Sequence, residues 1–141
     1  MSDVPVVLGP TQETLLIPLL GRAEETRRNG LIDDPIAVRI VDRLDYDFSK
    51  WDGAPSLRGA TIRTRIYDAQ VQRFLDAHPE GTVVEIGAGL NTRFERLDNG
   101  RAHWVELDLP DTMALRRQFF QDHERRTMVA ASVLDTDWFA T

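Results

Sequence analysis

The amino-acid sequence predicts an α/β fold built on a parallel β-sheet. Three short apolar runs rich in β-branched residues have the length and composition of strands, and they lie at 82–87, 103–109 and 127–133. Helical patterns separate these runs, at about 91–97 and at about 110–122. Alternation of strand and helix in this order is typical of the beginning of an open, parallel sheet.

The N-terminal part of the chain is expected to be helical. Apolar residues recur at i, i+4 spacing over 11–29, which indicates an amphipathic helix, and Pro18 marks a point where it can kink. A second, shorter helix is expected to begin at Pro35, with Asp33 or Asp34 as its N-cap. Two helices therefore precede the region of the predicted sheet.

A long third helix is expected over 57–77. Its apolar residues fall on one face, so we expect that face to pack against something larger. The residues of this face are Ile62, Ile66, Tyr67, Val71, Phe74 and Leu75. These patterns divide the chain into an N-terminal helical cap region at 1–54 and the first half of an α/β domain at 55–141.

Composition and charge exclude several classes of function. The formal net charge of −6 over 141 residues opposes binding to a phosphate backbone, so we expect no nucleic-acid partner. Cysteine is absent and the three histidines lack partners at ligand spacing, so we expect no metal site. The sequence has neither a secretory leader nor an apolar run of about 20 residues. We therefore expect a cytoplasmic protein with no membrane partner.

The run at 82–87 reads as a strand buried on both faces and flanked on both edges. The chain supplies a neighbour for one edge only, because the third predicted strand is followed by the residues DTDWFAT. An unpaired edge on an apolar strand is an aggregation hazard. We therefore expect either that the chain continues past Thr141 with at least two more strands on that side, or that a second copy covers the edge in a homodimer.

A Gly-x-Gly turn directly follows the first predicted strand. Gly87 and Gly89 allow a tight turn and a close approach of the backbone to a ligand. A dinucleotide site has a further glycine for the pyrophosphate and for helix packing, and Thr92 stands at that place. The turn therefore favours a nucleoside ligand that has no pyrophosphate.

Two acids complete this pattern and point to S-adenosylmethionine. Glu85, on the first strand, suits the ammonium group of that ligand or an intervening water. Asp108, at the end of the second strand, lies 19 residues after Gly89, close to the spacing of about 20 expected for a carboxylate that binds ribose hydroxyls. Asp108 also has a plainer interpretation, as a cap before Pro110. Glu106 is expected to be a solvated side chain near an exposed strand end.

Several ordered motifs resemble one known family. They are DDPIAV, IRTRIYDAQV, VVEIGAGLNTRFERL, WVELDLP and AASVLDTDW, and the similarity runs from about residue 15 to residue 138. Together they resemble the leucine carboxyl methyltransferase family, and most closely its bacterial branch of tetracenomycin polyketide synthesis-like O-methyltransferases. Asn91 is a departure, because this family usually has aspartate there.

The resemblance implies a Rossmann-like class I methyltransferase that uses S-adenosylmethionine to methylate a carboxylate or hydroxyl of a small molecule such as a polyketide. Arg63 matches the arginine that pairs with the methionine carboxylate, whereas Arg65 is expected to be solvated. Gly87 and Gly89 match the glycines under the methionine and ribose portions, and Asp108 matches the ribose carboxylate. The adenine contact corresponds to Ser132, Val133 and Leu134, with Ser132 replacing the family's acid.

Two other functions stay open on the sequence alone. An oxidoreductase could bind NAD at the same turn, although Thr92 opposes it, and a non-catalytic interaction module would use the half domain without an active site. No residue can be named as a general base, so the catalytic residues are unassigned. The sequence therefore predicts a cofactor site without a complete reaction site.

Overall fold

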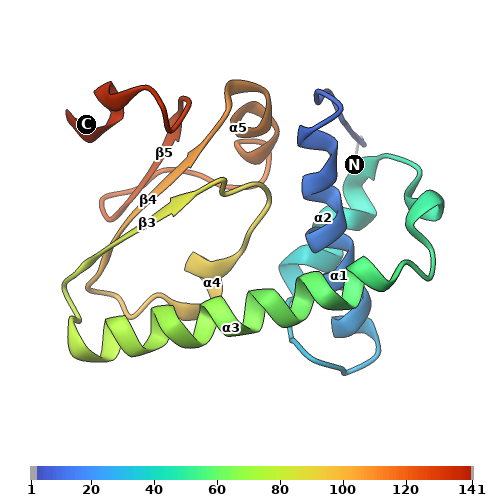
Figure 1. Ribbon diagram of the computed structural model, residues 1–141, viewed down its shortest axis with the longest axis horizontal. Helices are drawn as coiled ribbons and strands as arrows, with labels where there is room; N and C mark the ends of the chain where they lie inside the picture. Colours follow the sequence, from blue (N-terminus) through green and yellow to red (C-terminus); the bar gives the residue numbers. More distant parts are fainter. Residues whose placement is uncertain (1–2, 141) are drawn as a thin grey trace. The chain divides into compact units, whose positions relative to one another are not determined.

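The computed structural model describes residues 3–140, which fold as two compact units that divide between Gln70 and Val71. The first unit holds the N-terminal helices, and the second holds a three-stranded sheet with its flanking helices (Figure 1). One helix, α3 (Pro55–Ala77), runs from the first unit into the second.

The first unit consists of short segments around two helices. Its elements are β1 (Val4–Pro5), η1 (Gln12–Leu15), α1 (Leu16–Arg27), α2 (Pro35–Arg43), β2 (Leu44–Asp45), η2 (Phe48–Trp51) and the first part of α3. The predicted helix at 11–29 is thus a 3-10 turn followed by an α-helix. Pro18 lies in the first turn of α1, where its missing N–H costs no hydrogen bond. Asn29 adopts a left-handed φ of 53° and ends the helix.

Local polar contacts fix the connection between α1 and α2. The side chain of Asp34 accepts a hydrogen bond from the N–H of Ala37 at 3.0 Å, which confirms one of the two predicted caps. The same carboxylate pairs with the buried Arg22 at 2.9 Å, so neither charge is left uncompensated. A Cβ on Gly21 would lie 2.4 Å from the carbonyl oxygen of Leu57, so α1 approaches α3 closely there.

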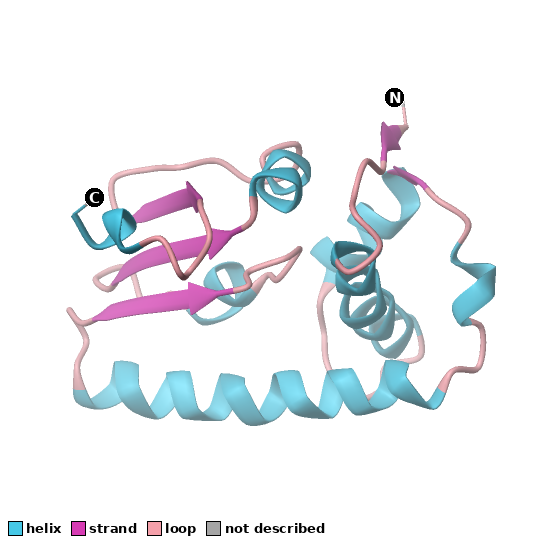
Figure 2. Ribbon diagram, turned by 45° about the horizontal axis from the view of Figure 1, so that its top comes forward, coloured by secondary structure: helices cyan, strands magenta, loops and turns pink. Residues whose placement is uncertain are grey.

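The second unit contains a parallel sheet of order β3-β4-β5. Its strands are β3 (Thr82–Ile86), β4 (His103–Asp108) and β5 (Arg126–Ala130), and they point in the same direction (Figure 2). The connections carry α4 (Arg93–Leu97) and α5 (Pro110–Arg116), and η3 (Thr136–Ala140) follows β5. The predicted class is confirmed: an α/β chain with three strands of a Rossmann-like parallel sheet, preceded by N-terminal helices.

The two faces of the sheet differ because side chains alternate along a strand. One face packs a core of Val83 and Trp104 against Leu75 of α3, with Phe94 and Leu97 of α4 around them. Phe94 meets Trp104 edge to face, with ring centroids 5.6 Å apart. This apolar contact holds the C-terminal part of α3 and all of α4 on the same side of the sheet.

The opposite face of the sheet is only partly covered by residues 3–140, so these residues alone do not bury β3 on both faces. Val84 and Ile86 are 44% and 58% exposed. The described residues that lie over this face come from η3, and the outer edge of β3 pairs with no strand within 3–140. Whether more strands or a second copy cover that edge stays a prediction.

The predicted apolar face of the long helix is also largely uncovered. Ile62, Ile66 and Tyr67 are exposed, and only Val71 and Leu75 of the predicted set reach the core of the second unit. Within the first unit, α3 instead buries its Leu57 side chain. The helix exists as predicted, but the described residues do not bury most of the face that the periodicity selects.

Candidate functional site

The loop after β3 is shaped by two glycines in left-handed conformation. Gly87 has a φ of 73° and Gly89 a φ of 51°, a region that costs other L-residues about 1–2 kcal/mol. The N–H groups of Gly87 and Ala88 both donate to the carbonyl oxygen of Leu107 on β4, at 2.8 and 3.1 Å. The loop therefore folds back onto the neighbouring strand and leaves Gly87 at its turn.

The space beside Gly87 is open. A Cβ built on this residue would meet no other heavy atom within 4 Å, and the residue itself is exposed. The left-handed φ, rather than crowding by the protein, is therefore the reason for glycine here. The same open space lets another molecule approach the backbone of the loop.

Asp108 closes the loop from the end of β4. Its Oδ2 accepts the N–H of Gly89 at 2.8 Å, and its Oδ1 accepts the N–H of Leu109 at 2.7 Å. Each carboxylate oxygen has two acceptor sites, so the side chain retains acceptor capacity for hydroxyl groups. The half-buried Asp108 thus joins the two elements that the sequence predicted to meet.

Glu85 points to the helix-covered face of the sheet. It is 7% exposed and pairs with Arg93 at 2.6 Å, and it also accepts a hydrogen bond from Nδ2 of Asn91 at 3.2 Å. Burial raises the pKa of Glu85 above its ordinary value, while the charge of Arg93 opposes that rise. Its present partners come from the loop and from α4, so Glu85 supports the loop from beneath.

Asn91 explains how the departure from aspartate is accommodated. Its Oδ1 accepts the N–H of Arg93 at 2.7 Å, while its amide donates to Glu85. An aspartate would bring a second negative charge to Glu85 and lacks the amide donor. Asparagine therefore suits this pairing, because it caps the N–H of Arg93 and donates to Glu85 at the same time.

The segment after β5 reaches the same edge of the sheet. β4 and β5 pair through Asp108 and Ala130, and the N–H of Ala131 continues the ladder to the carbonyl oxygen of Asp108 at 3.0 Å. Ser132 then makes a turn in which its Oγ accepts the N–H of Leu134 at 3.2 Å. Ser132 is half-buried, while Leu134 is 88% exposed.

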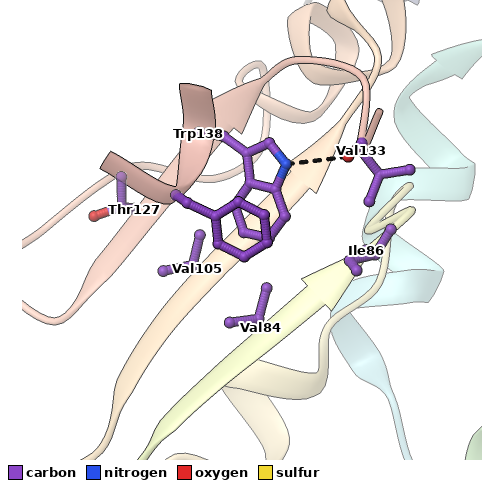
Figure 3. Close-up of a pocket in the computed structure, with 7 residues that line it drawn as sticks. Val84, Ile86, Val105, Thr127, Val133 and Trp138 are labelled. Atoms are coloured by element: carbon purple, nitrogen blue, oxygen red, sulfur yellow. Dashed lines mark hydrogen bonds between the residues drawn. The ribbon is translucent and has the colours of Figure 1, made fainter. Parts of the chain in front are cut away.

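Val133 also borders an apolar groove on the partly covered face of the sheet. Figure 3 shows Trp138 above this face, with its indole nitrogen donating to the carbonyl oxygen of Val133 at 3.3 Å. The groove encloses about 510 Å³ and is lined by Val84, Ile86, Val105, Thr127, Val133, Trp138 and Phe139. It begins beside the predicted adenine contact and extends over the sheet.

The expectation for Glu106 is wrong, because its side chain is fully buried. Its Oε2 accepts hydrogen bonds from the Nε of Arg116 and from the Nε of Arg126, both at 3.0 Å. Arg126 also pairs with Glu95 at 2.6 Å, so two glutamates balance two arginines beneath the loop. The sequence predicts a solvated glutamate near a strand end because the two arginines that pair with Glu106 lie 10 and 20 residues further along the chain.

Arg63 lies in the first unit and the other predicted residues lie in the second. Both Arg63 and Arg65 are exposed on α3, and no hydrogen bond or ion pair is found for either within the described part of the chain. The predicted role of Arg63 stays a prediction. The structure brings together Glu85, Gly87, Gly89 and Asp108, with Ser132, Val133 and Leu134 at the same edge.

Sequence reasoning missed three arginines around this loop. Arg93, Arg116 and Arg126 are all held by buried carboxylates. The one available signal was Arg93, which follows Glu85 by eight residues across the turn.

The described residues contain no cluster of side chains suited to a metal ion, and they form no helix long and apolar enough to cross a bilayer.

Comparison with known proteins agrees with this architecture. The family model for leucine carboxyl methyltransferase matches residues 16–141. The chain is also 35% identical over 132 residues to the tetracenomycin polyketide synthesis O-methyltransferase TcmP of Streptomyces glaucescens. That match covers 92% of this chain and 49% of the relative, so the chain spans about half the length of this protein. Because the family model matches nearly all of the chain, the chain belongs to the leucine carboxyl methyltransferase family.

Proposed function

We propose that this chain binds S-adenosylmethionine and carries the cofactor site of an O-methyltransferase that acts on a carboxylate or hydroxyl of a small molecule. The observation that carries the proposal is the joining of Gly89 to Asp108, with the open turn of Gly87 beside it. This arrangement offers a carboxylate for ribose hydroxyls next to a backbone that a ligand can approach.

The use of the loop's N–H groups favours this cofactor over a dinucleotide. A pyrophosphate is bound by backbone N–H groups that point at the ligand. Here the N–H groups of Gly87 and Ala88 donate to Leu107, and that of Gly89 donates to Asp108. The loop thus presents a carboxylate and few free donors, which suits a ligand with hydroxyl groups and a positive charge.

Thr92 supports the same choice. Its side chain is fully buried, and its Oγ1 accepts Nε of Arg96 at 3.0 Å. In a dinucleotide fold the third glycine lets the helix approach the strand and the ligand closely. A buried threonine at that place is a specific feature against the oxidoreductase alternative.

The proposal assigns a role to each predicted residue. Asp108 would hold the ribose hydroxyls, and Gly87 and Gly89 would lie under the methionine and ribose portions. Residues 132–134 would border the adenine, and Arg63 would pair with the methionine carboxylate. For Glu85, contact with the ammonium group would run through a water, because Arg93 and Asn91 already engage its oxygens.

When bound, the cofactor supplies an electrophilic methyl group, and the protein's task is to orient the accepting oxygen and exclude water. An ionised carboxylate needs no general base, whereas a hydroxyl group would need one, and no residue is assigned to that role.

The name of the relative TcmP connects that protein with tetracenomycin polyketide synthesis, so we include a polyketide among the substrates proposed. We also propose a cytoplasmic location, without nucleic-acid or membrane partners.

Ligand-dependent thermal stability tests this function. S-adenosylmethionine at 100 times its dissociation constant should stabilise the native protein by about 2.7 kcal/mol. S-adenosylhomocysteine should also stabilise it, and NAD should not. Stabilisation by NAD alone would favour the oxidoreductase, and no response to any of the three would favour a non-catalytic interaction module.

A further inference from the structure

The side chain of Arg116 connects the glycine loop to the sheet beneath it. Arg116 is the last residue of α5 and is fully buried. Its Nη1 donates to the carbonyl oxygens of Gly89, at 3.1 Å, and Asn91, at 2.8 Å. These are backbone atoms of the loop itself, and the two bonds span its second half.

The other edge of the same guanidinium is held by a carboxylate. Nε donates to Oε2 of Glu106 at 3.0 Å, and Nη2 lies 2.8 Å from Oε1. The plane of Arg116 also lies over Phe120, with the guanidinium carbon 4.3 Å from the ring centroid. Glu106 and Phe120 therefore fix the orientation of the guanidinium, which in turn fixes the two carbonyl groups.

We propose that Arg116 is a positioning residue for the cofactor site, because it holds the loop from Gly89 to Asn91 in the shape that presents Gly89 to Asp108. The inference rests on the proposed function for its effect on S-adenosylmethionine, but the loop contacts are independent of any ligand. Arginine suits this position because its planar fork has five donors, which serve two carbonyls and a carboxylate at once. A lysine has one charged nitrogen and cannot reach all of them in this geometry.

Arg126 provides a matched control within the same cluster. It also donates to both oxygens of Glu106, through Nε at 3.0 Å and Nη2 at 2.9 Å. Its further partner is Glu95 on α4, and within residues 3–140 it donates no hydrogen bond to the loop carbonyls. Replacement of either arginine disturbs a buried charge, but only replacement of Arg116 removes the loop contacts.

The test compares Arg116→Lys with Arg126→Lys in the whole protein. Amide hydrogen exchange at residues 89–92 and the dissociation constant of S-adenosylmethionine are measured beside the thermal stability. We expect both variants to lose stability, while Arg116→Lys alone accelerates exchange in the loop and weakens cofactor binding by about tenfold or more. Equal effects of the two variants on the loop and on binding, or none, would overturn the role of Arg116.

A second variant covers the case in which Arg116→Lys does not fold. Arg116→Met combined with Glu106→Gln removes the loop contacts together with the counter-charge, and Arg126→Met combined with Glu106→Gln also removes one charge of each sign while the Nη1 of Arg116 keeps its carbonyl partners Gly89 and Asn91. We expect faster loop exchange in the Arg116 double variant than in the Arg126 double variant, and equal rates in the two would contradict the proposal. If the unaltered protein does not bind S-adenosylmethionine, the proposed function fails, and loop exchange still decides whether Arg116 positions the loop.

Discussion

The backbone N–H of Gly89 and the carboxylate of Asp108 are joined by a hydrogen bond of 2.8 Å across 19 residues of sequence. The turn after β3 and the end of β4 are therefore connected to each other by the fold itself. Asp108→Ala should remove both this connection and the proposed contact with the ribose hydroxyls. We expect S-adenosylmethionine to bind at least about tenfold more weakly, which corresponds to the 1.5–3 kcal/mol of a hydrogen bond to a charged group.

Calorimetry on the folded variant measures this effect. Glu124→Ala is a suitable control, because Glu124 is exposed and lies just before β5, at the opposite end of the strands. Unchanged affinity of the Asp108 variant would remove Asp108 from the site.

Two glycines allow backbone strain to be separated from ligand contact. Gly87 and Gly100 have φ values of 73° and 78°, and a Cβ on either would meet nothing within 4 Å. Replacement of either glycine by alanine should therefore cost a similar amount, about 1–2 kcal/mol of unfolding free energy. Only Gly87→Ala should also weaken binding of S-adenosylmethionine, because its methyl group would enter the proposed ligand space. Equal binding by the two variants would contradict the placement of the ligand at Gly87.

The assignment of Arg63 can be tested against its neighbour Arg65. Both arginines are exposed on α3, so replacement by lysine should leave stability nearly unchanged. If Arg63 pairs with the methionine carboxylate, Arg63→Lys should weaken cofactor binding, since lysine cannot reproduce a bidentate fork. Normal binding by Arg63→Lys together with weak binding by Arg65→Lys would assign the contact with the methionine carboxylate to Arg65 instead.

Acid should destabilise the sheet unit through Asp98. Its carboxylate accepts hydrogen bonds from Arg125 at 2.7 and 2.6 Å, and these bonds lower the pKa of Asp98 below its ordinary value. Because the folded-state pKa is depressed, this stabilisation is present above the ordinary pKa of about 4 and is lost as pH falls through the folded-state value. Asp98→Asn should lower the unfolding free energy at neutral pH by about 1–2 kcal/mol and flatten its decline in acid.

Urea unfolding between neutral pH and about pH 2 measures this dependence. Glu80→Gln serves as the comparison, because Glu80 belongs to an exposed ion pair with Arg101. If the Asp98 variant declined in acid as steeply as the unaltered protein, the pair with Arg125 would not be a source of the pH dependence.

The sequence predicts those elements best that have a strong local pattern of residues. β-branched runs with a glycine turn identified β3 and β4, and an aspartate before a proline identified the start of α2. The third strand was placed at 127–133 but pairs over Arg126–Ala130, because its last apolar residues leave the ladder for the turn at Ser132. The helix from Pro110 ends at Arg116, well before the predicted 122, and turns follow it.

Buried charge was the feature that the sequence could not reveal. Glu106 is expected from the sequence to be a surface residue, because burial of a charge is unfavourable without a partner. Its partners Arg116 and Arg126 become its neighbours only when β4, β5 and α5 are assembled, so no local pattern predicts them. The role of Glu85 in the site stays a prediction, and its pairing with Arg93 depends on the shape of the turn between them.

The sharing of Glu106 by two buried arginines restricts how this chain can change over evolutionary time. Loss of Glu106 alone would leave Arg116 without a carboxylate partner and Arg126 with Glu95 alone, and loss of either arginine would leave the cluster with excess negative charge. Replacement of the whole set by apolar residues of similar volume costs far less folding stability than replacement of any one member alone. We therefore expect lineages to retain Glu106, Arg116 and Arg126 as a group, or to exchange them together, with the loop carbonyls then requiring a new donor.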